Sequence, residues 1–271
     1  MYVRALQIQT DLMLRGFDGQ RIDRPTHVVM RTPANPTFRW GNYLVFPDAP
    51  TADDLQRWPR IFTDEMQDIP EVTHLAFTWD ALDGALGASD AFVAAGYDRW
   101  TLATMSLTAL APEGRLPTPC QIRYLETDAD WAEWIELAEA QNDAQPPEYR
   151  EGAGHRAFVE KTCVGHRAMI AAGWGRWFGA YVDGRLASSM GLFVREGLGR
   201  FQAVDTHPDF RRRGLATTLL RHAVTEGLER MGANTLVIVA DVDEAAIGIY
   251  AAAGFETTEQ IIQIELVERT L

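Results

Sequence analysis

The sequence is poor in the residues that disulfide-bonded, metal-binding and nucleic-acid-binding proteins need. Its 271 residues include only two cysteines, and 25 lysines and arginines stand against 38 aspartates and glutamates, a formal charge of −13. The two thiols, Cys120 and Cys163, form neither a disulfide framework nor a metal-ligand spacing, so we expect free thiols in a reducing compartment. Because phosphate binding needs a basic face, we expect no nucleic-acid partner.

Long apolar runs and targeting features are also missing. No stretch approaches the roughly 20 apolar residues that span a bilayer, and residues 1–7 lack the basic-then-apolar layout of a signal peptide. We therefore expect a cytoplasmic protein with no membrane partner. The six histidines are scattered and none has a cysteine or carboxylate at ligand spacing, so we expect no metal. Nucleophile elbow, Walker and dinucleotide motifs are absent.

The most informative stretch is residues 204–216, Val-Asp-Thr-His-Pro-Asp-Phe-Arg-Arg-Arg-Gly-Leu-Ala. It is typical of a strand end, a short basic loop and the first turn of a helix over residues 215–231. Backbone N–H groups at a helix start lack intrahelical partners, and the helix dipole adds partial positive charge there. Gly214 permits close approach of a ligand, and the three arginines raise the local potential. The stretch predicts a pyrophosphate-binding turn.

Two motifs resemble those of the GCN5-related N-acetyltransferase (GNAT) superfamily. The first, which resembles the acyl-CoA-binding motif, is Arg211-x-x-Gly214-x-Ala216 after a strand ending Val204-x-Thr206-x-Pro208. The second resembles a helix with a tyrosine that ends at a glycine before a strand: Asp243-x-x-Ala246-x-x-Ile249-Tyr250-x-x-x-Gly254-Phe255. The resemblance implies an α/β (α+β) fold, with a mixed, mostly antiparallel sheet flanked by helices, and acetyl-CoA as cosubstrate.

The chain divides at a segment rich in helix-breaking residues. Three prolines and a glycine in residues 111–120 predict an interdomain linker over residues 111–119. Residues 120–271 have the predicted order strand–helix–helix–strand–strand–strand–helix–strand–helix–strand, the full layout of the family. They are predicted to form the catalytic domain, with its second helix over residues 149–171.

Residues 1–110 repeat part of this layout. We predict helices over residues 3–17, 52–67 and 89–95, and strands over residues 27–31, 39–46, 72–78 and 101–107. The segment Phe92-Val-Ala-Ala-Gly96-Tyr97 matches the pattern of Tyr250-Ala-Ala-Ala-Gly254-Phe255, with a strand after each. We interpret this half as a shortened, degenerate GNAT-like domain in a tandem arrangement.

The first half lacks the cofactor motif. At the corresponding turn it has Phe46-Pro-Asp-Ala-Pro-Thr-Ala-Asp-Asp-Leu55. Two prolines remove backbone donors, and Asp53 and Asp54 would repel a pyrophosphate. We therefore expect one working site, in the second half, and a structural role for the first.

The resemblance also assigns site residues. A backbone N–H near the strand end would bind the thioester carbonyl, main-chain N–H groups of the turn would bind the pyrophosphate, and Tyr250 would protonate the departing thiolate as general acid. The residues expected to bind acetyl-CoA are Val204, Asp205, Thr206, Arg211, Arg212, Arg213, Gly214, Leu215, Ala216 and Thr217.

The general base is left open by the sequence. Period-two alternation places Asp205 on the face of Phe201 and Ala203, but strands of this family usually carry a bulge here that could re-aim it. Asp205 is the tentative base, and deprotonation through water without a dedicated base is the alternative. Glu148 and Glu151 are candidates for binding a cationic amine.

The predicted function is transfer of an acetyl group from acetyl-CoA to an amine, by direct attack in a ternary complex. The acidic second half favours a small cationic acceptor. Two alternatives stay open: an acyl-CoA-binding regulatory protein without turnover, and an acetyltransferase for protein N-termini. The protein is expected to be a monomer or a homodimer.

Overall fold

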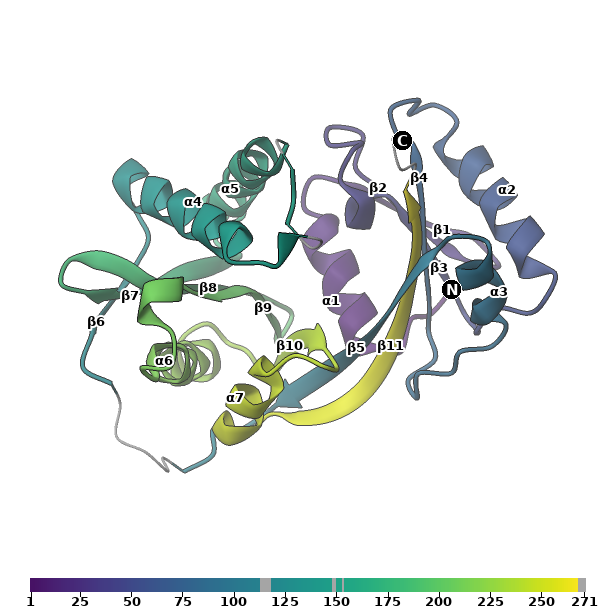
Figure 1. Ribbon diagram of the computed structural model, residues 1–271. Helices are drawn as coiled ribbons and strands as arrows, with labels where there is room; N and C mark the ends of the chain where they lie inside the picture. The colour runs from purple at the N-terminus through teal and green to yellow at the C-terminus, as the bar shows by residue number, and fades with distance from the viewer. Residues whose placement is uncertain (113–117, 148–149, 153, 268–271) are drawn as a thin grey trace. The chain divides into compact units, whose positions relative to one another are not determined.

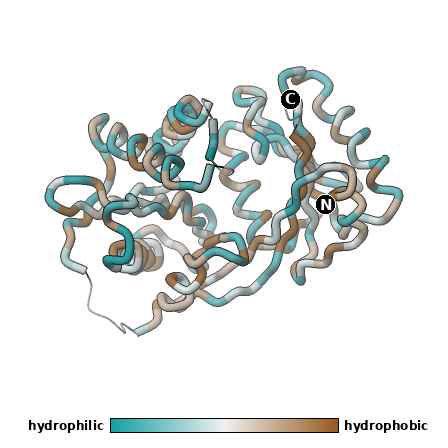
Figure 2. The backbone as a smooth tube through the Cα atoms, in the orientation of Figure 1, coloured by the Kyte–Doolittle hydropathy of each residue, from teal (hydrophilic) through white to brown (hydrophobic). Residues whose placement is uncertain are grey.

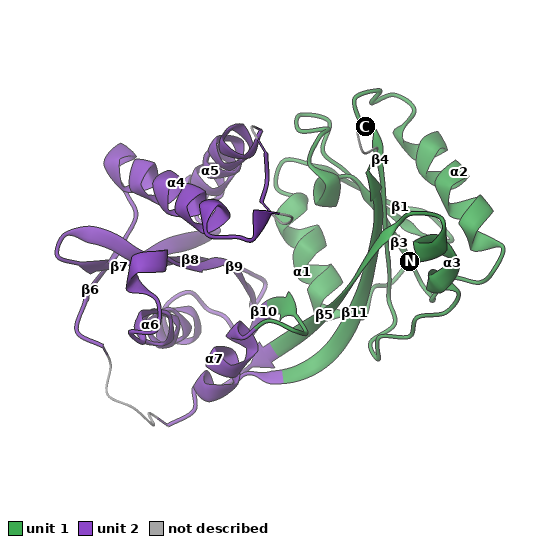
Figure 3. Cartoon of the chain, in the orientation of Figure 1, with its two compact units in different colours: residues 1–105, 239–244, 257–271 green, residues 106–238, 245–256 purple. Residues whose placement is uncertain are grey.

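The computed structural model describes residues 1–112, 118–147, 150–152 and 154–267 (Figure 1). Its helices and strands follow the hydrophobic pattern of the sequence. Figure 2 shows hydrophobic stretches on strands and helices and mostly hydrophilic residues in the connecting loops. The chain forms two compact units, drawn in different colours in Figure 3. Unit 1 comprises residues 1–105, 239–244 and 257–271, and unit 2 comprises residues 106–238 and 245–256.

Unit 1 is a sheet with helices on both faces. Its strands follow the order β1-β2-β3-β4-β11-β5, in which β3 and β4 are parallel and β11 is antiparallel to β4. The elements are α1 (Leu6–Arg15), β1 (Gln20–Asp23), β2 (Val28–Arg31), the 3-10 turn η1 (Arg39–Gly41), β3 (Tyr43–Phe46), α2 (Asp54–Met66), β4 (His74–Trp79), α3 (Ser89–Ala94), and most of β5 (Asp98–Leu107) and β11 (Glu256–Val267).

Alternate side chains of this sheet face different helices, as the two-residue period of a strand requires. Tyr43 and Val45 belong to a buried cluster with residues of α1, whereas Leu44 and Phe46 belong to one with residues of α2 and α3. The ring of Phe46 stacks on Trp58, with centroids 4.0 Å apart and planes 5° from parallel.

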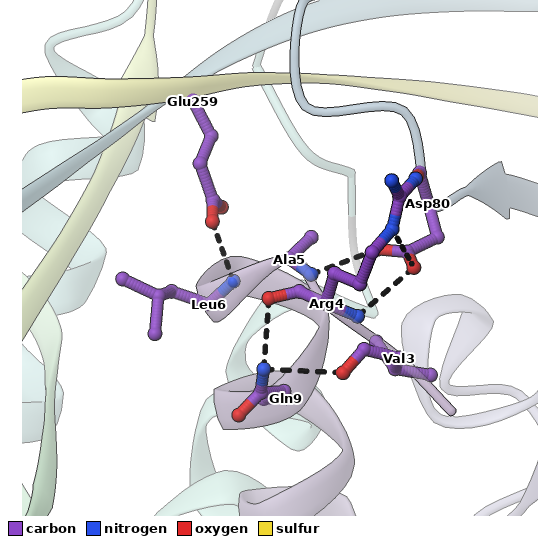
Figure 4. Close-up of polar contacts among 7 residues, drawn as sticks. All are labelled: Val3, Arg4, Ala5, Leu6, Gln9, Asp80 and Glu259. Atoms are coloured by element: carbon purple, nitrogen blue, oxygen red, sulfur yellow. Dashed lines mark hydrogen bonds and ion pairs between the residues drawn. The ribbon is translucent and has the colours of Figure 1, made fainter.

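The start of α1 is capped by two buried carboxylates (Figure 4). Asp80 accepts hydrogen bonds from the N–H groups of Arg4 and Ala5, at 2.9 and 2.8 Å. Glu259 of β11 accepts from the N–H groups of the next two residues, at 2.8 and 3.3 Å. The N–H groups that a helix start leaves without partners are thus satisfied within the unit, with charges that suit the helix dipole.

Unit 2 has the strand order β10-β9-β8-β7-β6. Strands β9 and β10 are parallel, and the other neighbours are antiparallel. The elements are β6 (Gln121–Tyr124), α4 (Asp128–Asp143), α5 (His155–Ala171), β7 (Gly175–Val182), β8 (Arg185–Arg195), β9 (Leu198–Thr206), the 3-10 turn η3 (Pro208–Phe210), α6 (Leu215–Glu229), β10 (Thr235–Asp241), whose last three residues belong to unit 1, and α7 (Ala246–Ala253).

Aromatic side chains fill the core of unit 2. Trp131 and Trp134 of α4 are both 3% exposed, and their ring centroids lie 5.5 and 5.2 Å from that of Trp177 in β7. Phe178, the next residue of β7, points to the other face and contacts His222 of α6, with centroids 6.0 Å apart. Helices α4 and α6 therefore cover opposite faces of the sheet.

The mixed α/β fold is confirmed, as is the predicted order of elements for residues 120–271. Along the whole described chain, three details differ from the prediction. Strand β1 was not expected, because its polar, largely exposed residues lack an apolar face. The strand expected over residues 39–46 begins only at Tyr43, since Arg39–Gly41 form a 3-10 turn. Helix α5 begins at His155. Residue 149, where its start was expected, lies outside the described residues.

The compact units do not coincide with the predicted domains 1–110 and 120–271. Residues 257–271 belong to unit 1 because β11 pairs antiparallel with β4 over five residues, from Gln263↔Thr78 to Val267↔His74. Of the expected linker, residues 113–117 lie outside the described part. On either side of it Ala111 donates its N–H to the Ala253 carbonyl, and Thr118 donates its N–H to the Thr218 hydroxyl.

A capping box fixes the start of α4. The Thr127 hydroxyl accepts from the Asp130 N–H, and Asp130 accepts from the Thr127 N–H at 2.8 Å. The Asp130 carboxylate also contacts the Arg123 guanidinium at 2.6 Å. Burial alone would raise the pKa of Asp130, but the N–H groups of Thr127 and Glu126, then Arg123 and the Thr127 hydroxyl, hold this pKa well below its ordinary value.

This depressed pKa predicts how stability depends on pH. The carboxylate stabilises the fold above the ordinary carboxyl pKa of about 3.9 and loses that contribution as the pH falls. We expect Asp130→Asn to lower the free energy of unfolding at neutral pH by about 1–3 kcal/mol. The difference from the unmodified chain should begin to shrink below about pH 5 and keep shrinking until the pH falls through the depressed pKa of the folded state, as measured by urea denaturation.

The matched control is Asp128→Asn in the same helical turn. The Asp128 side chain is 90% exposed and pairs with the exposed Arg167, so its loss should change the free energy of unfolding by less than about 1 kcal/mol. Equal losses for the two variants would contradict the role of the Asp130 cap.

Candidate functional site

The site of unit 2 begins where the pairing of two parallel strands stops. Strand β9 pairs with β10 only from Leu198↔Thr235 to Arg200↔Val237, and β9 then continues to Thr206. Ala203 has a φ of +45°, a conformation that costs a non-glycine residue of order 1 kcal/mol. The second half of β9 therefore has main-chain groups that no parallel ladder with β10 uses.

A β-bulge at this point re-aims Asp205. On β8, Gly191 pairs with Gln202 and Ser189 pairs with Asp205, so β9 holds one extra residue between these pairs. Residues opposite one another in an antiparallel pair share a face. Asp205 therefore lies on the face of Gln202 and not on that of Phe201, where simple alternation places it.

The turn after β9 presents a row of main-chain donors. Within the described chain, the N–H groups of residues 212–217 have no hydrogen-bond acceptor. They include the first turn of α6, where the helix dipole adds positive charge. Arg212 and Gly214 both have positive φ, 64° and 80°, so the backbone changes direction twice within the turn. Such consecutive donors fit the oxygens of a pyrophosphate.

Gly214 has no room for a side chain. A Cβ there would lie 2.8 Å from the Thr118 hydroxyl oxygen. That hydroxyl donates to the Arg213 carbonyl at 2.6 Å and so holds the backbone of the turn in place. A glycine is therefore required both by its φ and by its neighbour.

The three arginines of the turn have different surroundings. The Arg213 guanidinium donates to the Asp209 carbonyl at 2.9 Å and lies 5.0 Å from the ring centroid of Phe210. The Arg211 guanidinium donates to the Thr206 carbonyl at 3.4 Å and to the Gln141 side-chain oxygen. Arg212 is exposed. Leu215 is 1% exposed and packs in a cluster with Ala187 and Phe210, so it offers the ligand only its backbone.

A polar pocket lies beside the re-aimed carboxylate. We call it the α4–β9 pocket; its volume is about 470 Å³, and it is lined by Ala138, Gln141, Asn142, Gln145, Glu151, His155 and Asp205. The Gln141 amide donates to the Asp205 carboxylate at 3.3 Å. The structure thus brings the predicted base to a cavity, next to the turn that carries the donors.

One further acidic residue, Glu151, lines this pocket. The Asn142 side-chain nitrogen donates to the Glu151 carbonyl at 3.0 Å, and the Asn142 side-chain oxygen accepts from the Glu151 N–H at 2.8 Å. His155 contacts the Glu139 carboxylate at 2.5 Å. The predicted Glu151 therefore lies at the pocket, whereas Glu148 is outside the described residues.

The predicted acid Tyr250 is buried on α7, 4% exposed. Its ring meets Phe255 edge-on with centroids 6.5 Å apart, and Phe255 contacts Phe201 of β9 at 6.0 Å. This row of rings joins α7 to the bulged strand. The role of the Tyr250 hydroxyl stays a prediction.

The corresponding region of unit 1 is closed. Strands β3 and β4 stay paired to their last residues, Phe46↔Trp79, and the Asp80 N–H continues the ladder to the Phe46 carbonyl at 2.9 Å. At the start of α2, the Asp54 carboxylate accepts from the Thr51 N–H at 2.7 Å. Among the described residues of unit 1, β3 and β4 thus leave no free strand end like that of β9 in unit 2.

Comparison with known proteins identifies the domain. The sequence model of the acetyltransferase (GNAT) family matches residues 131–255. These residues are a GNAT acetyltransferase domain. The family takes an acyl group from acyl-CoA, which agrees with the donors of residues 212–217. No curated protein shows significant sequence similarity to the chain.

Solved structures extend the likeness in fold to almost the whole chain. A GCN5-related N-acetyltransferase from Kribbella flavida is 15% identical with a TM-score of 0.65, over 98% of this chain and 96% of that one. A protein of unknown function from Staphylococcus epidermidis is 13% identical with a TM-score of 0.71, over 92% and 94%. A tandem GNAT protein from the clavulanic acid biosynthesis pathway is 15% identical with a TM-score of 0.59, over 97% and 89%.

Two glutamines of the α4–β9 pocket were not predicted. Gln141 and Gln145 lie on the same helical stripe as Trp131, Trp134 and Ala138. A core-facing stripe that changes from tryptophan to amides indicates that the core ends in a polar cavity. This change was the signal in the sequence for the α4–β9 pocket.

Two expected absences can be compared with the described part of the chain. No group of three or more histidines, cysteines and acidic residues there is arranged to hold a metal ion. The helices described are also too short or too polar to cross a bilayer.

Gly214→Asp tests the donor turn of the GNAT domain. A side chain would collide with Thr118, and a carboxylate would occupy the donors, at a cost of about 3 kcal/mol. We expect the Kd for acetyl-CoA to rise on the order of 100-fold, measured by isothermal titration calorimetry.

Gly232→Asp is the matched control. Gly232 has nearly the same positive φ, 76°, but a Cβ at this position would meet no other atom within 4 Å. The Kd of this variant should stay within about threefold of the unmodified chain. Retained affinity in Gly214→Asp would sink the assignment of the turn.

Proposed function

We propose that the chain transfers an acetyl group from acetyl-CoA to the primary amine of a small cationic molecule bound in the α4–β9 pocket. The observation that carries the proposal is the position of Asp205. The bulge turns this carboxylate into the pocket, while the neighbouring residues of the same strand lead directly into the donor turn. One strand end thus serves both the acyl donor and the acceptor.

The donor turn supports acyl-CoA as the first substrate. In unit 1 the N–H groups at the start of α1 are taken by Asp80 and Glu259, whereas those of residues 212–217 have no acceptor in the described chain. Open donors beside Arg211 and Arg213 suit a pyrophosphate. The acetyl group as the acyl group transferred is part of the proposal.

The charge of the pocket supports a cationic acceptor. Asp205 and Glu151 are both among its lining residues, and its histidine contacts the Glu139 carboxylate. A partly enclosed site with acidic walls attracts a protonated amine and disfavours an anion. The volume of about 470 Å³ fits a small molecule.

The residues present divide the proton transfers between them. The acyl thioester supplies the carbonyl carbon, to which the amine nitrogen forms a bond as the carbon–sulfur bond breaks. Asp205 accepts a proton from the attacking amine, and Tyr250 donates one to the leaving sulfur. A phenol with an ordinary pKa near 10 is protonated at neutral pH, as a general acid must be.

The first half then serves as a degenerate GNAT-like domain without a site of its own. Phe92 of α3 and Tyr97, just before β5, form an edge-on pair with centroids 5.2 Å apart, as do Tyr250 of α7 and Phe255, just before β11. At the position of Tyr250 this repeat has Phe92, which has no hydroxyl. This supports the division into domains 1–110 and 120–271 by duplication.

A panel of amines tests the function. CoA release from acetyl-CoA should occur with at least one of 1,4-diaminobutane, lysine amide and glucosamine, and should be slower with a tripeptide that has a free α-amino group. Tight acetyl-CoA binding without release with any amine would indicate an acyl-CoA-binding regulator. Preference for the tripeptide would indicate an acetyltransferase for protein N-termini.

Tyr250→Phe tests the acid. Loss of the proton donor should lower kcat about 100-fold and leave the Kd for acetyl-CoA within about threefold. Tyr97→Phe, which removes the hydroxyl of another buried tyrosine, 6% exposed, should leave kcat unchanged. An unaltered rate in Tyr250→Phe would return this side chain to a packing role.

A further inference from the structure

One side chain joins the acyl-donor turn to the acceptor carboxylate. The Gln141 side-chain oxygen accepts from the Arg211 guanidinium, and its amide nitrogen donates to Asp205 Oδ1 at 3.3 Å. Arg211 also donates from Nε to the Thr206 carbonyl at 3.4 Å. These contacts connect α4, the end of β9 and the turn that follows it.

We propose that Gln141 is a positioning residue, which holds the Asp205 carboxylate in place for the acceptor amine and is itself oriented by Arg211. The inference rests on the proposed function, because it assigns the role of Asp205 toward an amine. It adds a residue that neither motif contains and that lies 64 positions from Asp205 in the sequence.

The chemistry of the three side chains fixes which way the amide points. A guanidinium only donates and an ionised carboxylate only accepts, whereas the glutamine amide does both. Gln141 must therefore turn its oxygen to Arg211 and its nitrogen to Asp205. A glutamate here would oppose Asp205 with a like charge, and an apolar side chain would leave both partners without the contact.

The backbone on either side gives the contact a fixed frame. Gln141 belongs to a helix that is anchored by Trp131 and Trp134 in the core and capped at Thr127. Asp205 follows a bulge, and its carbonyl accepts from the Ser188 hydroxyl at 2.6 Å. Both main chains are thus held, so the Gln141 amide restricts mainly the Asp205 side chain.

The test is a double-mutant cycle of Gln141→Met and Asp205→Asn, with the best amine of the panel and acetyl-CoA as probes. Methionine keeps the length of the side chain and removes both polar ends. We expect Gln141→Met to lower kcat/KM for the amine about tenfold and to leave the Kd for acetyl-CoA within about threefold. In the Asp205→Asn background the same substitution should have less than about a threefold effect.

Glu136→Met is the control on the same helix; this side chain is 66% exposed and lies outside the pocket lining, so the substitution should leave kcat/KM within about threefold. Crystal structures give a readout that needs no turnover. The Asp205 carboxylate should leave its position, or occupy more than one rotamer, in Gln141→Met and keep its position in Glu136→Met.

The outcomes separate the two proposals. Unchanged kinetics in Asp205→Asn would remove Asp205 from the proposed mechanism. Impaired Asp205→Asn together with full activity in Gln141→Met, or effects that multiply in the double variant, would overturn the positioning role alone. An Asp205 side chain that stays in place in the Gln141→Met crystal structure would also overturn it, whatever the activity.

Discussion

The site depends on a parallel ladder that stops early. In unit 2, β9 and β10 share three residue pairs, and a bulge with a positive φ at Ala203 follows at once. The bulge uses the register of β8 to turn Asp205 toward α4. In unit 1 the equivalent pair, β3 and β4, stays joined to its ends. The two units differ in site chemistry because one ladder ends within the sheet and the other does not.

The two units also differ in whether the N–H groups at a helix start have acceptors within the protein. A helix start has donors that need acceptors, and unit 1 supplies them from its own acidic side chains at α1. Unit 2 leaves the donors at the start of α6 open within the described residues, and it has glycine at a position where a Cβ would lie too close to Thr118. Local polar pairing therefore distinguishes a structural helix start from one that is suited to binding.

Local sequence signals predicted most of the fold and the donor turn. Gly214 was recognisable from its local pattern of strand end, basic loop and helix start, whereas its contact with Thr118 was not. The face of Asp205 could not be read from alternation alone, since it depends on the register of β9 against β8. Gln141 was missed for a similar reason: its two partners come from a strand and a turn more than 60 positions away. Strand β1 could not be predicted, because its residues form no apolar face.

The last strand has a consequence for how the chain is made. Strand β11 contributes Ile262 and Ile264 to the buried cluster of Phe46 and Trp58 and lies between β4 and β5 in the strand order. During synthesis, the amino-terminal residues leave the ribosome long before this strand does. Until it arrives, β4 has an unpaired edge, which is a hazard for association with other chains. Unit 1, although it is translated first, can complete its sheet only after most of unit 2 has been made.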